Sequence, residues 1–193
     1  LLHRYYAANV SMIDSQVGQS MTALEKRGYL DNTIIIFCSD HADALGEHGH
    51  IQKWTMYDCV TRVPLIFRAP EKIKMQHQCD DLVQLMDIAP TILNFAGVEP
   101  PHNWEALALN KMLETGCWDD QKPDHKLREY VYAELGRDHI QSGAEYVIMR
   151  RDERWKYVIY PGTDDGELYD IQNDPRETVN LWHDPQYFNQ RKD

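Results

Sequence analysis

Apolar and polar positions divide the first third of the chain into a helical pattern and a short apolar run. Over residues 4–27 the apolar side chains recur every three or four positions, which lays them along one face of a helix. These side chains are Tyr6, Val10, Ile13, Val17, Met21 and Leu24. Gly28 ends the predicted helix. The continuous apolar run at residues 33–38 predicts a strand buried on both faces, as in a parallel sheet, and this opening is typical of a layered α/β domain.

The middle of the chain predicts one more strand and one more helix. Residues 63–67 form a second short apolar run, in which Pro64 favours an edge or strand-entry position. Residues 81–95 have a helical pattern that Pro90 interrupts and Gly97 closes. Residues 98–128 are polar and contain several prolines, so we expect them to be irregular.

The last third of the chain predicts a small antiparallel sheet. Four short strand-like runs are separated by residues typical of turns: residues 130–135, 146–151, 155–160 and 167–171. A run of strands that follows alternating helices and strands favours a separate antiparallel layer. The pattern therefore predicts an α/β part at residues 1–99, an irregular linker at 100–128 and a small β subdomain at 129–193.

Charge and composition exclude several classes of function. The formal net charge of −11 argues against a nucleic-acid partner, because nucleic-acid phosphates require a basic surface. No apolar run approaches the length of about 20 residues that spans a bilayer. The four cysteines have no C-x-x-C spacing, so they indicate neither a zinc site nor a disulfide framework, and we expect buried thiols: Cys38, Cys59, Cys79 and Cys117.

Polar residues with the chemistry of a metal site follow the first predicted strand. Asp40 and His41 come directly after the apolar run, and ligands of open α/β sheets gather beyond the carboxyl ends of the strands. A carboxylate and an imidazole can share a divalent metal ion. Lys53 follows twelve residues after His41 and can hold an anionic substrate oxygen. Taken alone, these residues favour a polar capping loop and a solvated lysine over a metal site.

A longer ordered set of segments resembles the sulfatase family of the alkaline-phosphatase-like superfamily, which also holds the phosphonate monoester hydrolases. The segments are SDH at 39–41, LGEHG at 45–49, Lys53, RVPL at 62–65, DNT at 31–33, DIAPTIL at 87–93, ELYD at 167–170 and DP at 174–175. The resemblance implies an α/β fold, with an alkaline-phosphatase-like layered α/β/α part plus a small C-terminal antiparallel sheet subdomain. It covers nearly the whole chain, although residues 100–128 match weakly.

The resemblance also implies roles for four residues. Asp40 and His41 are the implied ligands of a divalent metal, Ca²⁺ or Mn²⁺. Lys53 is the implied catalytic and substrate-binding lysine, which stabilises charge as the leaving group departs. His48 is either a substrate-facing imidazole or a structural one. The substrate implied is a small anionic ester, of the sulfate class.

The nucleophile of this family has no counterpart in the chain. Sulfatases convert the cysteine of a Cys-x-Pro-x-Arg segment to formylglycine, and none of the four cysteines lies in such a segment. The paired N-terminal metal-binding acids of the family are also missing. We therefore expect this chain to be the C-terminal part of a hydrolase, with the formylglycine upstream of Leu1 and little activity without the N-terminal portion.

Three alternatives stay open. A phosphonate monoester or phosphodiester hydrolase has the same fold and the same Asp-His pair. A non-haem iron oxygenase could use His41-x-Asp43, although its triad normally sits in an all-β barrel. A catalytically incomplete remnant or binding module would keep the C-terminal layer alone. One departure from the family bears on the site: Ala42 stands where glycine is usual, and a positive φ there would raise the energy of alanine.

Overall fold

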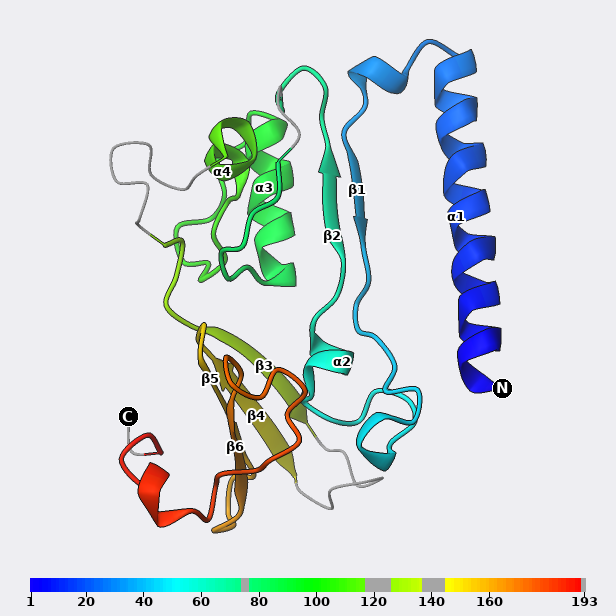
Figure 1. The fold of residues 1–193 in the computed structure, drawn as a ribbon. Coiled ribbons are helices and arrows are strands. Elements are labelled where there is room, and N and C mark those ends of the chain that lie inside the picture. Colours follow the sequence, from blue (N-terminus) through cyan, green and yellow to red (C-terminus); the bar gives the residue numbers. More distant parts are fainter. Residues whose placement is uncertain (74–76, 117–125, 137–144, 192–193) are drawn as a thin grey trace.

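A long helix forms one side of the molecule (Figure 1). The computed structural model describes residues 1–73, 77–116, 126–136 and 145–191. Helix α1 (Leu2–Lys26) confirms the first helical pattern, and Gly28 follows it with a φ of 71°. No residue of α1 is buried. Its apolar face and the first strand line an open hollow of about 430 Å³, so this face has few packing partners in the described chain.

The first two strands form a two-stranded antiparallel sheet. Strand β1 (Ile35–Cys38) pairs with β2 (Leu65–Arg68), and Ile35 lies opposite Arg68. The prediction of a parallel strand buried on both faces is therefore wrong for the described residues, since β1 is half-buried at its start and exposed at its end. The apolar run indicates a strand but carries no information on the direction of its neighbour. Here the chain turns back through a compact loop, which an antiparallel pair permits without a crossover.

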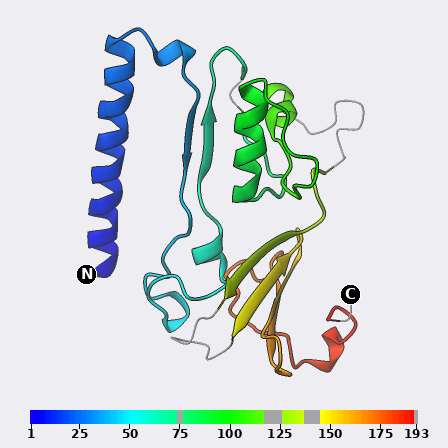
Figure 2. The ribbon, with the colours of Figure 1, turned by 180° about the vertical axis from the view of Figure 1, so that it is seen from behind.

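Two helices cover one side of β2 (Figure 2). Helix α3 (Ile88–Phe95) follows a 3₁₀ turn η3 (Leu85–Asp87) and begins later than predicted. Pro90 does not interrupt it, because it lies in the first turn, where the backbone N–H groups have no partner within the helix. A further helix, α4 (Asn110–Thr115), lies in the stretch predicted to be irregular, of which residues 117–125 fall outside the described chain. Leu109 and Met112 pack there against side chains of β2.

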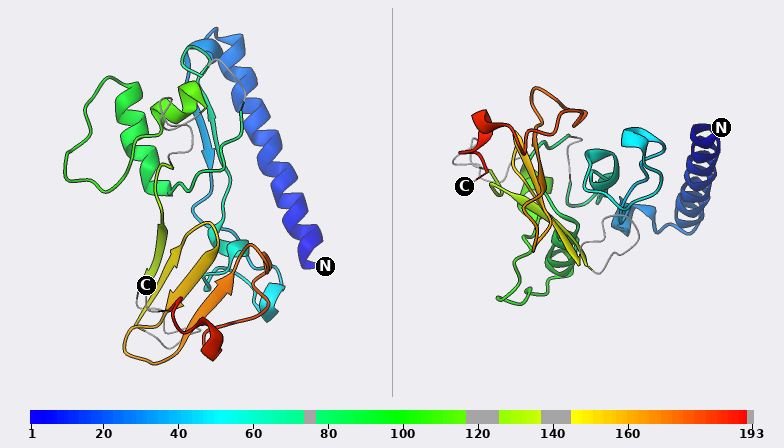
Figure 3. Two further views of the ribbon diagram at one scale, coloured as in Figure 1. Left: turned by 60° about the vertical axis from the view of Figure 1, so that its left-hand side comes forward. Right: turned by 90° about the horizontal axis from the view of Figure 1, so that it is seen from below.

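The predicted four-stranded antiparallel sheet is confirmed. Its order is β3-β4-β5-β6, and its bounds are Val131–Gly136, Tyr146–Arg151, Trp155–Ile159 and Gly166–Asp170. One face packs around Met56, a residue of the loop between β1 and β2, which contacts Val147, Met149 and Val158. Figure 3 shows the short helix α2 (Asp58–Thr61) of the same loop beside this sheet. The loop that follows β1 is therefore supported by the C-terminal sheet.

The remaining predictions concern the membrane and the cysteines. In the described ranges, no helix is both long and apolar enough to cross a bilayer. Cys38, Cys59 and Cys79 are free thiols, but Cys38 is exposed and the other two are half-buried, so the expectation of buried cysteines is wrong for Cys38. Cys117 lies outside the described residues.

Candidate active site

Backbone hydrogen bonds fold residues 39–62 into a compact loop. The N–H of Ala42 donates to the carbonyl of Val60 at 2.9 Å, and the N–H of Ala44 donates to the carbonyl of Gln52 at 2.9 Å. The turn in between, η2 (Glu47–Gly49), needs a positive φ at several positions, including 101° at Gly46. Ala42 is not among the positive-φ residues, so alanine replaces the usual glycine there without strain. This folding brings residue 53 back to residue 41.

Asp40, His41 and Lys53 come together at the end of β1. The Nζ of Lys53 lies 2.8 Å from Nε2 of His41, and that nitrogen lies 3.5 Å from Oδ2 of Asp40. The Asp40 side chain is 84% exposed and that of His41 34% exposed, so the group faces solvent in the described chain. The arrangement offers a carboxylate, an imidazole and an ammonium to one small anionic ligand or its metal ion.

Local hydrogen bonds fix the orientation of His41. Its Nδ1 lies 3.1 Å from the carbonyl oxygen of Ala42, which can only accept, so the proton is assigned to Nδ1 and the lone pair to Nε2. Nε2 is then free to accept the hydrogen bond of Lys53 or to bind a metal ion. The backbone N–H of His41 donates to Oδ1 of Asp40 at 3.0 Å and is the main reason that the pKa of Asp40 lies below its ordinary value. Asp40 is therefore a carboxylate at neutral pH.

The donor atoms of Asp40 and His41 suit a divalent metal ion, but two ligands do not complete its shell. A separation of 3.5 Å between the carboxylate oxygen and Nε2 allows both atoms to bind one cation at the usual ~2.1–2.6 Å. Within the described ranges, no group of three or more His, Cys, Asp or Glu side chains could hold a metal ion. Further ligands would have to come from residues outside this part of the chain.

His48 is not joined to this group and has a different environment. Its imidazole stacks on the ring of Tyr57, with ring centres 3.7 Å apart and ring planes 4° from parallel. Tyr57 in turn contacts Tyr169 of β6, and their ring centres are 5.9 Å apart. Tyr57 therefore lies between His48 and the C-terminal sheet. Sequence reasoning missed Tyr57, which carries no motif of its own.

A buried cluster of charges anchors the loop to the C-terminal sheet. Lys156 of β5 is fully buried, forms ion pairs with Asp58 and Glu177, and donates to the carbonyl of Met56 at 2.9 Å. Arg151 of β4 pairs with the second oxygen of Asp58 at 2.8 Å. Sequence reasoning missed this cluster as well. A signal was present in the sequence, because Lys156 lies two residues before the apolar Val158 and therefore on the same face of the predicted strand, where a buried lysine needs a partner.

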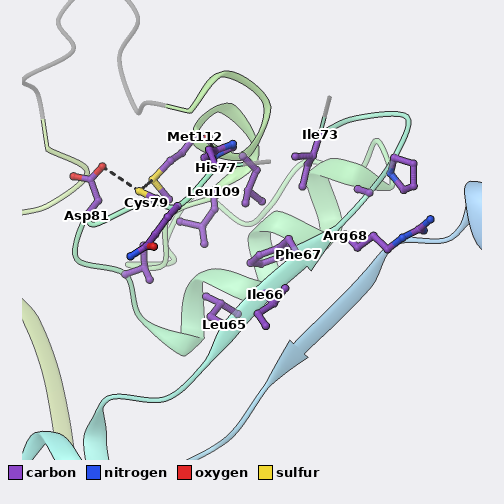
Figure 4. A pocket seen from close by; sticks show the side chains of 15 residues that line it. Leu65, Ile66, Phe67, Arg68, Ile73, His77, Cys79, Asp81, Leu109 and Met112 are labelled. Carbon is purple, nitrogen blue, oxygen red and sulfur yellow. Dashed lines mark hydrogen bonds between the residues drawn. The ribbon is translucent and has the colours of Figure 1, made fainter. Parts of the chain in front are cut away.

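An open hollow of the described chain lies away from these residues (Figure 4). It has a volume of about 520 Å³ between β2 and α4, and none of the four candidate site residues lines it. Cys79 lies in its wall beside Asp81 and Met112, and partial burial raises the pKa of its thiol. The lining is mainly apolar. The candidate site is therefore defined by its side chains rather than by a cavity.

Comparisons with known proteins point to one family. Residues 46–193 match the sequence model of the family described as "N-sulphoglucosamine sulphohydrolase, C-terminal". An N-acetylglucosamine-6-O-sulfatase of Bacteroides thetaiotaomicron is 36% identical over 98% of this chain, which spans 34% of that protein. An arylsulfatase of Clostridium perfringens is 30% identical over 94% of the chain, which spans 36% of its length.

Solved structures of high similarity belong to two kinds of hydrolase. One solved structure is described as a protein in complex with its substrate D-glucosamine-2-N,6-O-disulfate. It has a TM-score of 0.83 and 33% identity to this chain, and the match covers 95% of this chain and 36% of the solved chain. A phosphonate monoester hydrolase of Agrobacterium radiobacter has a TM-score of 0.82 and 30% identity, over 95% of this chain and 37% of its own. These likenesses confirm the predicted fold class. The chain spans about a third of the length of its relatives.

Proposed function

The chain belongs to the sulfatase family, and from this premise we propose that it supplies the C-terminal segment of a metal-dependent sulfuric ester hydrolase. The observation that carries the proposal is the convergence of Asp40, His41 and Lys53 at the end of β1. A carboxylate and an imidazole with a free lone pair suit a divalent cation, and an adjacent ammonium suits the oxygens of a sulfate ester. The relatives reported above are sulfatases with different substrates, which supports the same reaction class.

In this proposal Asp40 and His41 hold the metal ion, Ca²⁺ or Mn²⁺, together with ligands from the rest of the protein. When bound, such a cation neutralises charge on the transferring group and lowers the pKa of the nucleophile. The nucleophile, a formylglycine in the family that the motifs resemble, belongs to a segment outside this chain. Asp40 contributes a full negative charge, because its pKa is lowered.

In this proposal, the ammonium of Lys53 stabilises negative charge on the ester. An ammonium has three N–H donors, and His41 accepts one of them in the described chain. When a cation occupies this nitrogen of His41, the donors of Lys53 serve the anionic oxygens of the substrate and the leaving oxygen as charge develops on it. Trp54, whose ring centre lies 5.8 Å from the Lys53 Nζ, covers one side of the ammonium. His48 supplies a further donor to the substrate from the next turn of the loop.

A second candidate reaction is hydrolysis of a phosphonate monoester. The observation that favours it is the phosphonate monoester hydrolase whose structure matches this chain about as well as the glucosamine disulfate complex does. Both esters present anionic oxygens to a cation and an ammonium, so the described residues serve either. Rates on 4-nitrophenyl sulfate and on a phenyl phosphonate monoester, measured side by side, separate the two.

The proposal requires a larger protein, because the chain spans about a third of its relatives and has only two metal ligands in the described site. The open apolar hollow between α1 and β1 fits this view, since a further segment could pack there. Purified residues 1–193 should therefore have negligible activity, whereas the full-length protein should hydrolyse an aryl sulfate or N-acetylglucosamine 6-sulfate. Turnover by residues 1–193 that does not depend on Lys53 would contradict the proposal. A full-length protein without hydrolase activity would favour the binding module.

A further inference from the structure

His48 is held in an unusual backbone conformation by a stacked partner. Its φ of 52° lies in the left-handed region, which raises the energy of a residue with a Cβ. The chain therefore needs compensating contacts to keep His48 in place. The contact that the structure provides is the nearly parallel stack on Tyr57, at 3.7 Å between ring centres.

The hydroxyl of Tyr57 belongs to a series of hydrogen-bonded side chains that ends at the carboxylate of Glu167. Its hydroxyl oxygen lies 3.4 Å from that of Tyr169, and the Tyr169 hydroxyl lies 3.0 Å from Oε2 of Glu167. A carboxylate can only accept, so Tyr169 donates its single proton to Glu167 and accepts from Tyr57. These hydrogen bonds therefore run in one direction, from Tyr57 of the loop to Glu167 of β6.

The far end of this series of hydrogen bonds lies in the C-terminal sheet. Glu167 and Tyr169 lie on β6, and Tyr169 is buried. The second oxygen of Glu167, Oε1, accepts from the hydroxyl of Tyr160, at the end of β5. Burial raises the pKa of the Tyr57 and Tyr169 hydroxyls, so both stay protonated and able to donate at neutral pH. The carboxylate of Glu167 therefore accepts from Tyr160 through Oε1 and from Tyr169 through Oε2, and Tyr169 extends the hydrogen bonds to Tyr57 of the loop.

We propose that Glu167, acting through the hydroxyls of Tyr169 and Tyr57, fixes the orientation of the His48 imidazole, so that the C-terminal sheet sets where this ring meets the substrate. Glu167, Tyr169 and Tyr57 are positioning residues, whereas His48 contacts the ester; the inference rests on the function proposed above. Glu167 and Tyr169 of the ELYD segment at 167–170 thereby have a role. The other two residues of the segment are structural, since Leu168 is buried and Asp170 forms an ion pair with Arg154.

The test compares two Tyr→Phe variants that remove similar hydrogen bonds. Tyr169→Phe removes the hydroxyl that joins Tyr57 to Oε2 of Glu167. Tyr160→Phe removes the hydrogen bond to Oε1 of the same carboxylate. In NMR spectra of residues 1–193, the His48 ring protons should show the upfield shift of a stacked imidazole, with Tyr57→Leu giving the unstacked reference. Tyr169→Phe should move these signals toward the reference, and Tyr160→Phe should not.

Kinetics of the full-length protein give the second readout. Tyr169→Phe should lower kcat/KM about fivefold, the equivalent of one ordinary hydrogen bond, and should have no further effect once His48 is alanine. Unmoved His48 signals in Tyr169→Phe, or equal movement in both Phe variants, would overturn the positioning. An equal loss of kcat/KM with and without His48 would also overturn it. If the signals move as expected but His48→Ala is as active as the parent, the positioning stands and the substrate role of His48 fails.

Discussion

The Nζ of Lys53 lies 2.8 Å from Nε2 of His41, although the two residues are twelve positions apart. The imidazole must present the lone pair of Nε2 to accept this hydrogen bond. The same lone pair is the one that a metal ion would use. Lys53 and a cation on His41 therefore compete for one atom, and the ammonium must turn away, toward the substrate, when a cation is bound.

Lys53→Ala should lower kcat and kcat/KM of the full-length protein by roughly a hundredfold or more. A donor placed where charge develops is typically worth about 3 kcal/mol, and Lys53 is the ammonium nearest the candidate ligands. The loss should be smallest for the aryl ester with the best leaving group, because that ester needs the least stabilisation. Steady-state rates on a series of aryl sulfates measure both effects.

Lys72→Ala is the matched control for this variant, since Lys72 is an exposed lysine outside the site. Ordinary surface substitutions stay within ~0.5 kcal/mol, so it should change activity less than about twofold. A Lys53→Ala loss that is equal across leaving groups would indicate ground-state binding instead. No loss at all would remove Lys53 from the site.

Metal affinity should respond in opposite directions to changes at His41 and at Lys53. Loss of an outer-shell partner of a metal ligand costs roughly 10- to 100-fold in affinity, so His41→Ala and Asp40→Asn should cost at least as much. Lys53→Ala should leave the affinity for Mn²⁺ unchanged or raise it, because it removes both a competitor for Nε2 and a positive charge. Isothermal titration of the metal-free full-length protein measures these affinities.

Asp43→Asn is the control for metal binding. Asp43 belongs to the alternative His41-x-Asp43 pair of an iron oxygenase, and it has no role in the proposed site. Its variant should bind Mn²⁺ like the parent protein. Strong loss of affinity in Asp43→Asn, with little loss in Asp40→Asn, would favour the oxygenase pair over the sulfatase one.

Local patterns carried enough information for most helices and strands, but not for how the strands pair. The strand-like run at residues 146–151 predicts β4 with the bounds that the structure has. The run at 33–38 predicts a strand equally well, yet its partner β2 runs in the opposite direction to the one expected. Pairing depends on the path of the connecting loop, which no hydrophobic pattern describes.

The candidate site likewise combines a local part, which the sequence predicts, with distant contacts, which it does not. Asp40 and His41 are neighbours in sequence, so their proximity is a local property. The approach of Lys53 depends on left-handed conformations at Leu45, His48 and Gln52, in addition to those at the two glycines of the turn, and these three residue types do not signal such a conformation. The contacts of His48 depend on Tyr169, more than a hundred residues away, and no spacing in the sequence could indicate them.

Gly166→Ala should destabilise the C-terminal sheet. A Cβ at this position would lie 2.6 Å from the ring of Trp182, whose indole N–H is fixed by a hydrogen bond to the carbonyl of Asp164. Overpacking of this kind typically costs about 1–3 kcal/mol. Gly18→Ala is the control, because nothing lies within 4 Å of its Cβ and alanine favours a helix by about 0.5–1 kcal/mol. Urea unfolding of both variants measures the difference, and equal stabilities would contradict the close contact.

Lys156→Met should lower the free energy of unfolding by about 3 kcal/mol at pH 7. Removing one partner of a buried ion pair leaves an uncompensated charge, here on Asp58 and Glu177, and such losses typically cost about 3–5 kcal/mol. Lys126→Met is the control, because Lys126 and its partner Glu153 are 49% and 51% exposed. An exposed pair contributes at most about 1 kcal/mol. Similar losses in the two variants would show that the Lys156 cluster is not effectively buried.

The same variant should recover stability as the pH falls. Burial raises the pKa of Glu177 above its ordinary value of 4.5, while Lys156 acts in the opposite direction, so the pKa should rise further when Lys156 is lost. A carboxyl whose pKa is higher in the folded than in the unfolded chain binds more protons when folded, and stability then falls as the pH rises through that interval. The deficit of Lys156→Met relative to the parent should therefore be smallest near pH 4.5 and grow toward pH 7, in urea unfolding at a series of pH values. A deficit that is constant over this range would mean that Glu177 does not carry the uncompensated charge.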